Sequence, residues 1–326
     1  MTEHARDSRT FRSVLAAATA GCLLLLAAAC GPDAPEPSAG TADPAPGRAA
    51  APKAGFTLEG VGLATPESVL HDTAADVYLV SNVNGGPSAK DGNGFISRVS
   101  PDGTLLALKW IDGASDDVTL HAPKGLAIAG GKLYVADLDV VRIFDRETGA
   151  PAGEIAIAGS TFLNDVVPDD DGGFWVSDSG LKIDASGVRP TGTDAIYHVT
   201  AGGAIKRIAT GNALGRPNGL ARYGDALVMA TFGSNRVFLF NGSRLGTIFA
   251  ETPAGSLDGL VLGPDGRLLV SSWEGEAIYV VDGQKEPFPI ADGLPAPADF
   301  GLDLTRYMLL VPLFNDDKVV VRPLGA

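Results

Sequence analysis

The stretch that decides the fold of this chain is residues 257–272, Leu-Asp-Gly-Leu-Val-Leu-Gly-Pro-Asp-Gly-Arg-Leu-Leu-Val-Ser-Ser. An apolar run follows an acidic side chain, a Pro-Asp-Gly turn interrupts it, and a second apolar run ends in serine. Residues 124–137 repeat the pattern, with Lys124 as the leading polar residue and Asp137 at the end. Short runs rich in β-branched and aromatic residues, separated by such turns, are typical of antiparallel strands.

The same unit recurs along the chain from Phe56 onward. The residues that lead each repeat, which we call anchors, are Glu67, Lys124, Asn164, Asn218, Asp258 and Phe300. They recur at intervals of about 40 to 57 residues, and a period near 40 is typical of propeller blades with four strands. We therefore predict an all-β fold, a six-bladed β-propeller of four-stranded antiparallel blades. A β-sandwich or a solenoid is the alternative.

The last blade lacks one strand. Strands are expected near residues 301–304, 307–312 and 318–322, and the sequence stops soon afterwards. The segment Gly55–Glu59 is the simplest source of the missing outer strand. We therefore predict that the N-terminal strand closes the last blade, which leaves no free edge there.

Residues 1–30 have the features of a lipoprotein-type signal peptide. Three arginines precede an apolar run over residues 14–29, which is shorter than the roughly 20 residues that span a bilayer. Small residues lead from this run into Cys30 and resemble a bacterial lipobox, although Ala27 stands where leucine is preferred. The resemblance implies lipidation of Cys30. An ordinary signal peptide or a plain anchor with an incidental cysteine is the alternative.

Residues 31–54 are dominated by Ala, Pro, Gly, Ser and Asp, and such a composition predicts a disordered tether before a propeller over residues 55–326. The two cysteines are Cys22 and Cys30, so no disulfide is expected in the exported domain. We expect a monomer that is exported, anchored to the bacterial cell envelope as a lipoprotein, and in contact with the membrane through its lipid only.

The chain is acidic, with 39 Asp and Glu against 25 Lys and Arg and a formal net charge of −14. This charge argues against nucleic acid or an anionic membrane surface as the main partner. Acidic surfaces are also common on soluble proteins without a specific partner, so the charge does not identify a function.

Four short motifs carry the candidate site: Pro66-Glu67-Ser68, Leu163-Asn164-Asp165, Pro217-Asn218-Gly219 and Leu257-Asp258-Gly259. If the strands that follow them line a common axis, the four central side chains converge at one mouth of the channel. Two carboxylates and two amide carbonyls form a site for a hard divalent cation. Ca²⁺ fits this ligand set best, with Mg²⁺, Mn²⁺ or Zn²⁺ as alternatives.

The remaining candidates surround this mouth. Asp258 could bind the ion through one oxygen and orient or deprotonate a water through the other. Lys124 could hold an anionic substrate or stabilise a developing oxyanion, or it could be a solvated or salt-bridged lysine. The two longest loops between second and third strands, residues 82–94 and 179–194, are expected over the same mouth. No zinc spacing, nucleophile elbow, phosphate loop or dinucleotide motif is present in a suitable context.

These motifs resemble a known family. Residues 164–178 resemble the third-blade signature of the gluconolactonase/regucalcin (senescence-marker-protein-like) family, and the segments around Asn218, Asp258 and Glu67 resemble its fourth-, fifth- and first-blade motifs. The resemblance implies a divalent cation on Glu67, Asn218 and Asp258, contact of Asn164 with metal or substrate, and Asp258 as catalytic base. Phe162 stands where regucalcin-like members carry an arginine that grips sugar hydroxyls, which implies a less hydroxylated substrate.

The leading hypothesis is an exported metal-dependent hydrolase of the gluconolactonase-like class. It would open a small-molecule lactone or related ester with a central Ca²⁺-type ion and with Asp258 as base. The alternative is a non-catalytic ligand- or protein-binding β-propeller lipoprotein that keeps the ion for structure. A strictosidine-synthase-like propeller without hydrolase chemistry is a third possibility, which the intact set of four oxygen ligands disfavours.

Overall fold

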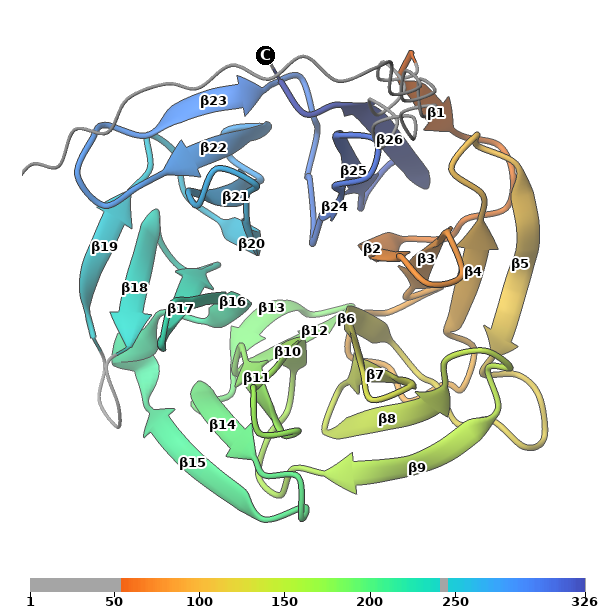
Figure 1. The fold of residues 1–326 in the computed structure, drawn as a ribbon. Helices are drawn as coiled ribbons and strands as arrows, with labels where there is room; N and C mark the ends of the chain where they lie inside the picture. Colours follow the sequence, from red (N-terminus) through yellow and green to blue (C-terminus); the bar gives the residue numbers. More distant parts are fainter. Residues whose placement is uncertain (1–53, 241–245, 326) are drawn as a thin grey trace, which may run out of the picture. The chain divides into compact units, whose positions relative to one another are not determined.

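In the computed structural model, which describes residues 54–240 and 246–325, six four-stranded antiparallel sheets surround a central axis (Figure 1). Each sheet is one blade, so the prediction of a six-bladed propeller is confirmed. Within the described residues the single helical element is the 3₁₀ turn η1 (Asn212–Leu214). No helix in this part of the chain is long and apolar enough to cross a membrane.

The strands of each blade run from the axis outward. Blade 1 contains β2 (Pro66–Asp72), β3 (Val77–Asn82), β4 (Phe95–Val99) and β5 (Leu105–Asp112), and blade 2 contains β6 (Pro123–Ala129), β7 (Lys132–Asp137), β8 (Val140–Asp145) and β9 (Pro151–Ala156). Blade 3 contains β10 (Leu163–Pro168), β11 (Phe174–Asp178), β14 (Ala195–Val199) and β15 (Ile205–Thr210), with a separate hairpin of β12 (Leu181–Asp184) and β13 (Gly187–Pro190).

The second half follows the same order. Blade 4 contains β16 (Pro217–Tyr223), β17 (Ala226–Thr231), β18 (Arg236–Phe240) and β19 (Thr247–Glu251), and blade 5 contains β20 (Leu257–Leu262), β21 (Leu268–Ser272), β22 (Ala277–Val281) and β23 (Phe288–Ala291). Blade 6 contains β24 (Gly301–Asp303), β25 (Met308–Leu313), β26 (Lys318–Pro323) and, as its outer strand, β1 (Phe56–Leu58).

The innermost strands share one irregularity at the anchor. In blades 1 to 5 the pairing with the second strand shifts register just after the first residue of the inner strand. Such a bulge re-aims the side chain at that point. Neighbouring inner strands approach closely there. A Cβ on Gly219, for example, would lie only 2.3 Å from the carbonyl oxygen of Asp258 in the next blade. Glycine is therefore needed after the anchors Lys124, Asn218 and Asp258, where the next inner strand approaches most closely.

The prediction of Phe300 as the sixth anchor is wrong. Pro297 pairs with Leu313 in blade 6 just as Pro217 pairs with Thr231 in blade 4, which puts Ala298 at the anchor position. Phe300 is 1% exposed and packs in the apolar layer of blades 5 and 6. The Phe300-Gly301 pair imitates an anchor followed by glycine, although the bulge lies two residues earlier.

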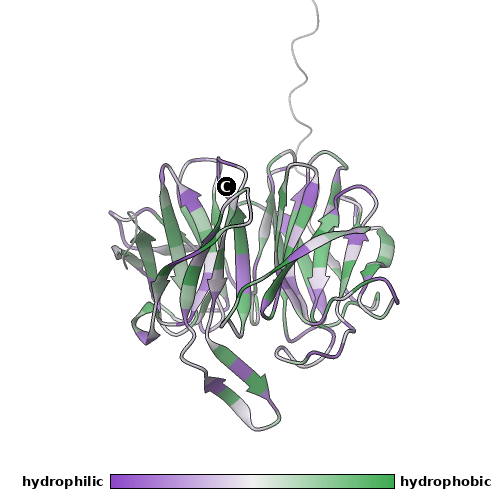
Figure 2. Ribbon diagram, turned by 90° about the horizontal axis from the view of Figure 1, so that it is seen from below, coloured by the Kyte–Doolittle hydropathy of each residue, from purple (hydrophilic) through white to green (hydrophobic). Residues whose placement is uncertain are grey.

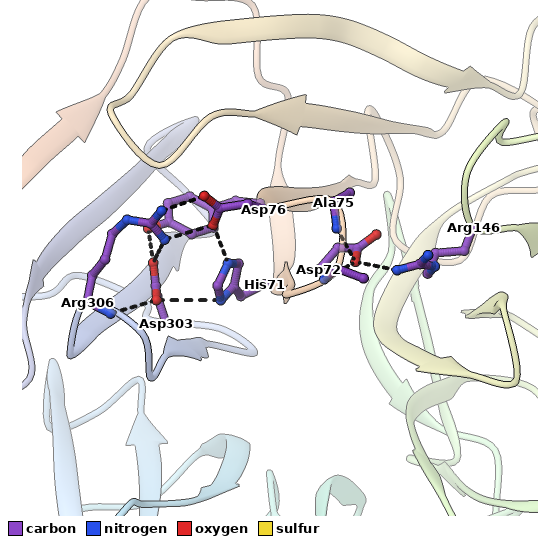
Figure 3. Close-up of polar contacts among 9 residues, drawn as sticks. His71, Asp72, Ala75, Asp76, Arg146, Asp303 and Arg306 are labelled. Atoms are coloured by element: carbon purple, nitrogen blue, oxygen red, sulfur yellow. Dashed lines mark hydrogen bonds and ion pairs between the residues drawn. The ribbon is translucent and has the colours of Figure 1, made fainter. Parts of the chain in front are cut away.

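Apolar layers between adjacent blades form the core. One layer joins blades 2 and 3, another joins blades 4 and 5, and a third joins blades 6 and 1. Ion pairs at the turns add contacts between blades, as Arg146 after β8 reaches Asp72 at the end of β2 at 2.9 Å (Figure 3). This packing holds the six inner strands, and therefore their anchors, in fixed positions around the axis.

The ring closes through the predicted N-terminal strand. Strand β1 pairs antiparallel with β26, and Leu58 lies opposite Val319. Leu58 is 5% exposed and packs in the layer between blades 6 and 1. The prediction that the N-terminal strand closes the last blade is confirmed.

A polar cluster clamps the junction of blades 1 and 6 (Figure 3). Arg306, in the turn after β24, pairs with Asp76 at 2.5 Å and with Asp303 at 2.8 Å. His71 lies 3.1 Å from Asp76, and the Tyr78 hydroxyl donates to Asp303 at 2.8 Å. Because these residues come from β2, β3 and the ends of β24, they join the first and last blades by a second route besides β1.

We expect Arg306→Gln to lower the free energy of unfolding at neutral pH by roughly 1–3 kcal/mol, because it leaves a buried carboxylate short of a charged donor. Hydrogen bonds from Arg306 lower the pKa of Asp76. Burial alone would raise the pKa of Asp303, but hydrogen bonds from Arg306 and Tyr78 outweigh it and lower this pKa too. A depressed folded-state pKa stabilises the fold above the usual aspartate value of 3.8 and ceases to do so as pH falls below it.

The difference in unfolding free energy between wild type and Arg306→Gln should therefore be largest at neutral pH and shrink below pH 3.8. Denaturant unfolding at several pH values measures it. Arg267→Gln is the control, because Arg267 pairs with the exposed Asp265. A difference that stays constant down to pH 3 would show that Arg306 acts by packing rather than by charge.

Candidate functional site

The sequence-predicted residues meet in one cavity at the axis. Its volume is about 220 Å³, and the five polar anchors line it together with a largely apolar wall. The polar members are Glu67, Lys124, Asn164, Asn218 and Asp258, and the apolar members are Pro87, Phe162, Leu181, Ile183, Val188, Phe232, Trp273 and Phe314. We call this the axial cavity.

Four oxygen atoms in the axial cavity are buried and lack a hydrogen-bond partner within residues 54–240 and 246–325. They are Glu67 Oε2, Asn164 Oδ1, Asn218 Oδ1 and Asp258 Oδ1, one from each sequence-predicted ligand. A buried acceptor without a partner loses the hydrogen bonds that water would supply, so native proteins contain few of them. Four in one cavity, all of types that bind hard cations, form a donor set that fits a divalent ion.

Neighbouring side chains determine which oxygen of Asp258 and of Asn164 is available to bind an ion. The indole Nε1 of Trp273 donates to Asp258 Oδ2 at 2.7 Å, which leaves Oδ1 without a partner. The Asn164 amide donates to Ser179 Oγ at 3.2 Å, and that hydroxyl donates to the Pro217 carbonyl at 2.5 Å. The amide nitrogen of Asn164 is thus held by the protein, and its carbonyl oxygen remains available.

Lys124 is buried and forms no salt bridge with the described part of the chain, contrary to one of the two sequence-based interpretations. Its side chain is 1% exposed, and Nζ donates to the carbonyl oxygens of Ala122 at 2.8 Å and Pro87 at 3.2 Å. The ammonium also lies 4.3 Å from the centre of the Phe162 ring. One of its three hydrogens is therefore used to hold loop 82–94, a second binds the chain just before β6, and the third remains for a ligand.

The site concentrates negative charge in a buried place. Burial, followed by the carboxylates of Asp258 and Asp299, raises the pKa of Glu67 well above its usual value. Burial and Asp299 raise the pKa of Asp258 to about 8, and burial lowers the pKa of Lys124 to about 8. Carboxylates with raised pKa values tend to be protonated unless a cation binds beside them. The charges around the cavity are therefore also suited to a divalent cation.

Asp165 and Asp299 form a second acidic layer that sequence reasoning did not single out. Each follows an anchor position, and each accepts a hydrogen bond from the next blade. Leu220 N donates to Asp165 at 2.6 Å, and Ser68 Oγ donates to Asp299 at 2.5 Å. These carboxylates therefore connect neighbouring inner strands. Asp165 could have been noticed from its place beside Asn164, whereas Asp299 could not, because the sixth anchor was assigned wrongly.

An aromatic wall lines one side of the axial cavity. Phe232 and Trp273 lie edge to face with ring centres 5.3 Å apart, and Trp273 and Phe314 lie 5.2 Å apart. Sequence reasoning missed these residues. A signal was present, because an aromatic residue directly follows the second strand in blades 4, 5 and 6. In blades 4, 5 and 6 the second strand ends at the mouth where the inner strand begins, and the residue that follows it lines the axial cavity.

The two long loops cover the opposite side, as predicted, and they touch each other. The Ile183 amide in loop 179–194 donates to Ser88 Oγ in loop 82–94 at 2.8 Å. Loop 179–194 folds into the β12–β13 hairpin, which sequence reasoning did not anticipate and which projects from one face of the propeller in Figure 2. Leu181, Ile183 and Val188 of this hairpin line the axial cavity.

Among the described residues, no group of three or more His, Cys, Asp and Glu side chains is arranged to hold a metal ion. The four candidate ligands in the axial cavity are not such a group, because they combine two carboxylates with two amides. Oxygen ligands of both kinds are ordinary for Ca²⁺, whereas zinc sites use mainly nitrogen and sulfur. The residues present therefore fit a hard cation and do not fit a structural zinc site.

Comparisons with known proteins agree with the propeller fold. A model of the family described as SMP-30/Gluconolactonase/LRE-like region matches residues 100–290. A gluconolactonase from Xanthomonas campestris has a similar structure at 21% identity and a TM-score of 0.61, covering 80% of this chain and 86% of that chain. A putative gluconolactonase is similar at 18% identity and a TM-score of 0.62, covering 85% and 96%.

A third structure, virginiamycin B lyase from Staphylococcus aureus, is similar at 15% identity and a TM-score of 0.56, covering 82% of this chain and 97% of that chain. At such identities these three likenesses show the fold alone. No curated protein sequence matches the chain.

Proposed function

Because the chain belongs to the SMP-30/gluconolactonase/LRE-like family, we propose that it is an exported, metal-dependent hydrolase that opens a lactone or a related ester. The family supports lactonase-type hydrolysis of a small molecule and a general dependence on divalent cations. The observation that carries the proposal for this chain is the set of four unpartnered oxygens in the axial cavity.

The protein groups divide the work of hydrolysis. Glu67, Asn164, Asn218 and Asp258 would hold the ion, most consistently Ca²⁺, which would polarise the substrate carbonyl. Asp258 would bind the ion through Oδ1, and its Oδ2, which accepts the indole hydrogen of Trp273 and has a second lone pair, takes a proton from the attacking water. The water oxygen bonds to the carbonyl carbon, the carbon–oxygen ester bond breaks, and the proton passes to the departing alkoxide. A lactone thus becomes one hydroxy acid.

The third hydrogen of Lys124 is the donor left to stabilise the oxyanion of the intermediate. Lys124 lies beside Phe162, so the position that grips sugar hydroxyls in regucalcin-like members is apolar here. The aromatic wall and the β12–β13 hairpin make most of the remaining surface apolar as well. We therefore propose a lactone or aryl ester with few hydroxyl groups rather than an aldonolactone.

A hydrolysis panel tests the proposal. It contains gluconolactone, alkyl-substituted lactones and aryl esters, each assayed with the purified protein in calcium and after chelation. Turnover of an apolar lactone or aryl ester that chelation abolishes and calcium restores is the expected result. Calorimetry of calcium binding, run beside it, separates the alternatives. Tight calcium binding without turnover of any panel member would favour a binding propeller that keeps a structural ion.

Glu67→Gln should weaken calcium binding by about tenfold or more, because the charge of the ligands sets the affinity of an oxygen site. Excess calcium should restore part of the activity. The variant also removes one of several crowded carboxylates, so its calcium-free form should melt at a higher temperature than the calcium-free wild type. Calorimetry and melting curves with and without calcium measure both effects. An unchanged affinity would exclude Glu67 from the ligands.

Export and lipid anchoring complete the proposal, and they rest on Cys30 and the preceding apolar run, which lie outside the described residues. Cys30→Ala should release the protein from membranes or block its processing, since several acyl chains anchor stably whereas one alone is marginal. Detergent partitioning and the mass of the mature N-terminus measure this. Partitioning and processing identical to wild type would contradict the anchor, and Cys22→Ala is the matched control.

A further inference from the structure

A second cavity adjoins the axial cavity on the same face. Its volume is about 390 Å³, and its lining includes Arg216, Ser234, Asn235 and Glu274. Phe232 lines both cavities, so they share a wall. We call this second space the side cavity. Because Arg216 lies two residues before the predicted ligand Asn218, a molecule bound at the ion site could extend into the side cavity.

Arg216 has no partner for its guanidinium among the described residues, and its backbone amide donates to Asp194 at 2.8 Å. Every other arginine within residues 54–240 and 246–325 contacts a carboxylate, a carbonyl oxygen or an aromatic ring. These are Arg98, Arg142, Arg146, Arg189, Arg207, Arg222, Arg236, Arg267, Arg306 and Arg322. A free guanidinium in a cavity beside the site is thus exceptional within this part of the protein.

The other polar side chains that line the side cavity each have a hydrogen-bond partner. The Ser234 hydroxyl lies 2.6 Å from Thr231 Oγ1, and the Asn235 amide donates to the Thr252 carbonyl at 2.7 Å. Glu274 accepts from the Gly255 amide at 3.0 Å and from Ser256 Oγ at 2.9 Å. The guanidinium of Arg216 therefore supplies the unused donors of this cavity, and its five donors match a carboxylate in a two-point contact.

The backbone at Arg216 does not by itself indicate function. Its φ of 60° resembles the 52° of Thr65 and the 53° of Ser256, which also directly precede inner strands. This turn therefore recurs before the inner strands of several blades and does not distinguish Arg216. What is special is the side chain, whose stem passes over Gly233, where a Cβ would lie 3.4 Å from Arg216 Cδ and 2.8 Å from the Gly215 carbonyl.

We propose that Arg216 is an anion-binding subsite, and that the substrate is an ester or lactone that carries a carboxylate away from the bond that breaks. This inference rests on the proposed function for the position of the reacting bond. The apolar part of the substrate would lie against the aromatic wall, and the carboxylate would pass Phe232 into the side cavity and bind the guanidinium.

Matched ester pairs test the subsite in the full-length protein with calcium. The probes are the 4-nitrophenyl monoesters of adipate and suberate, each compared with its neutral methyl diester. Wild type should prefer the monoesters, and Arg216→Gln should lower the ratio of kcat/KM for monoester over diester roughly 10- to 100-fold, the usual range for loss of a charge-assisted hydrogen bond. The ratio for Arg216→Lys should lie between those of wild type and Arg216→Gln, since an ammonium keeps the charge but not the two-point geometry.

Arg236→Gln is the matched control. Arg236 lies beside Asn235 in the sequence, and it pairs with the exposed Glu251 at 2.8 Å. The substitution therefore removes one positive charge near the side cavity and leaves Arg216 in place. Its ratio should equal that of wild type. If Arg216→Gln folds and leaves the ratio unchanged, the subsite is rejected. If Arg236→Gln lowers the ratio as much as Arg216→Gln does, the effect comes from the overall charge of the protein, and the subsite is again rejected.

A binding measurement separates this inference from the proposed function. The mono-4-nitroanilide of adipate replaces the reactive ester by an amide, and calorimetry compares it with its methyl ester. Binding that depends on the carboxylate and on Arg216, without hydrolysis of any ester, would support the subsite and reject the hydrolase. Ester hydrolysis that shows no preference for the carboxylate would retain the hydrolase and reject the subsite.

Discussion

Asp258→Asn should lower turnover at saturating calcium by about 10²–10⁴-fold, the usual range for loss of a general base. The side chain keeps its size, but it can no longer accept a proton from water. Calcium affinity should fall less than turnover, because Glu67, Asn164 and Asn218 remain as ligands. Initial rates over a calcium titration, together with calorimetry, give both quantities for the same preparation.

The contact with Trp273 complicates this substitution and also provides its control. Trp273 donates to one oxygen of Asp258, so the amide introduced by Asp258→Asn will turn its oxygen toward the indole and its nitrogen toward the ion site. Adding Trp273→Phe removes the indole donor and lets the amide oxygen face the ion. The double variant should therefore recover calcium affinity without recovering turnover. Turnover that returns with the ion would assign Asp258 as a ligand alone.

Deletion of residues 55–59 should have the largest effect on stability. It removes β1, exposes the edge of β26 and takes the side chains of Phe56 and Leu58 out of the layer between blades 6 and 1. Burial of two large apolar side chains contributes roughly 3–6 kcal/mol. We expect the melting temperature to fall on the order of 10 °C, or the protein to aggregate through its new strand edge.

A deletion of equal length within residues 31–50 controls for shortening of the chain. Leu58→Ala isolates the packing contribution, because it keeps the β1–β26 pairing while it opens a cavity beside Met308 and Val319. Calorimetric melting and light scattering measure the three variants together. If the deletion melts like the parent, the outer strand contributes nothing and the Arg306 clamp alone closes the ring.

The site shows where sequence patterns have predictive power. Glu67, Asn164, Asn218 and Asp258 could be assigned because each begins a strand that is readable from its apolar run, and the blade repeat places all such beginnings at one mouth. The same logic fails for Ala298, because a short inner strand and a misleading Phe300-Gly301 pair hide the bulge. The repeat therefore predicts positions well only where a local motif marks the bulge.

The sequence by itself determined the six-bladed fold, the strand that closes it and the four candidate oxygen ligands. These features follow from local periodicity and from turn chemistry, which act over a few residues. Only the tertiary structure decided which oxygens remain unpartnered, that Lys124 is buried, and that Arg216 stands free beside the site. Such properties depend on hydrogen bonds and burial between residues far apart in the chain, as between Trp273 and Asp258 or Lys124 and Pro87, and no pattern along one strand records them.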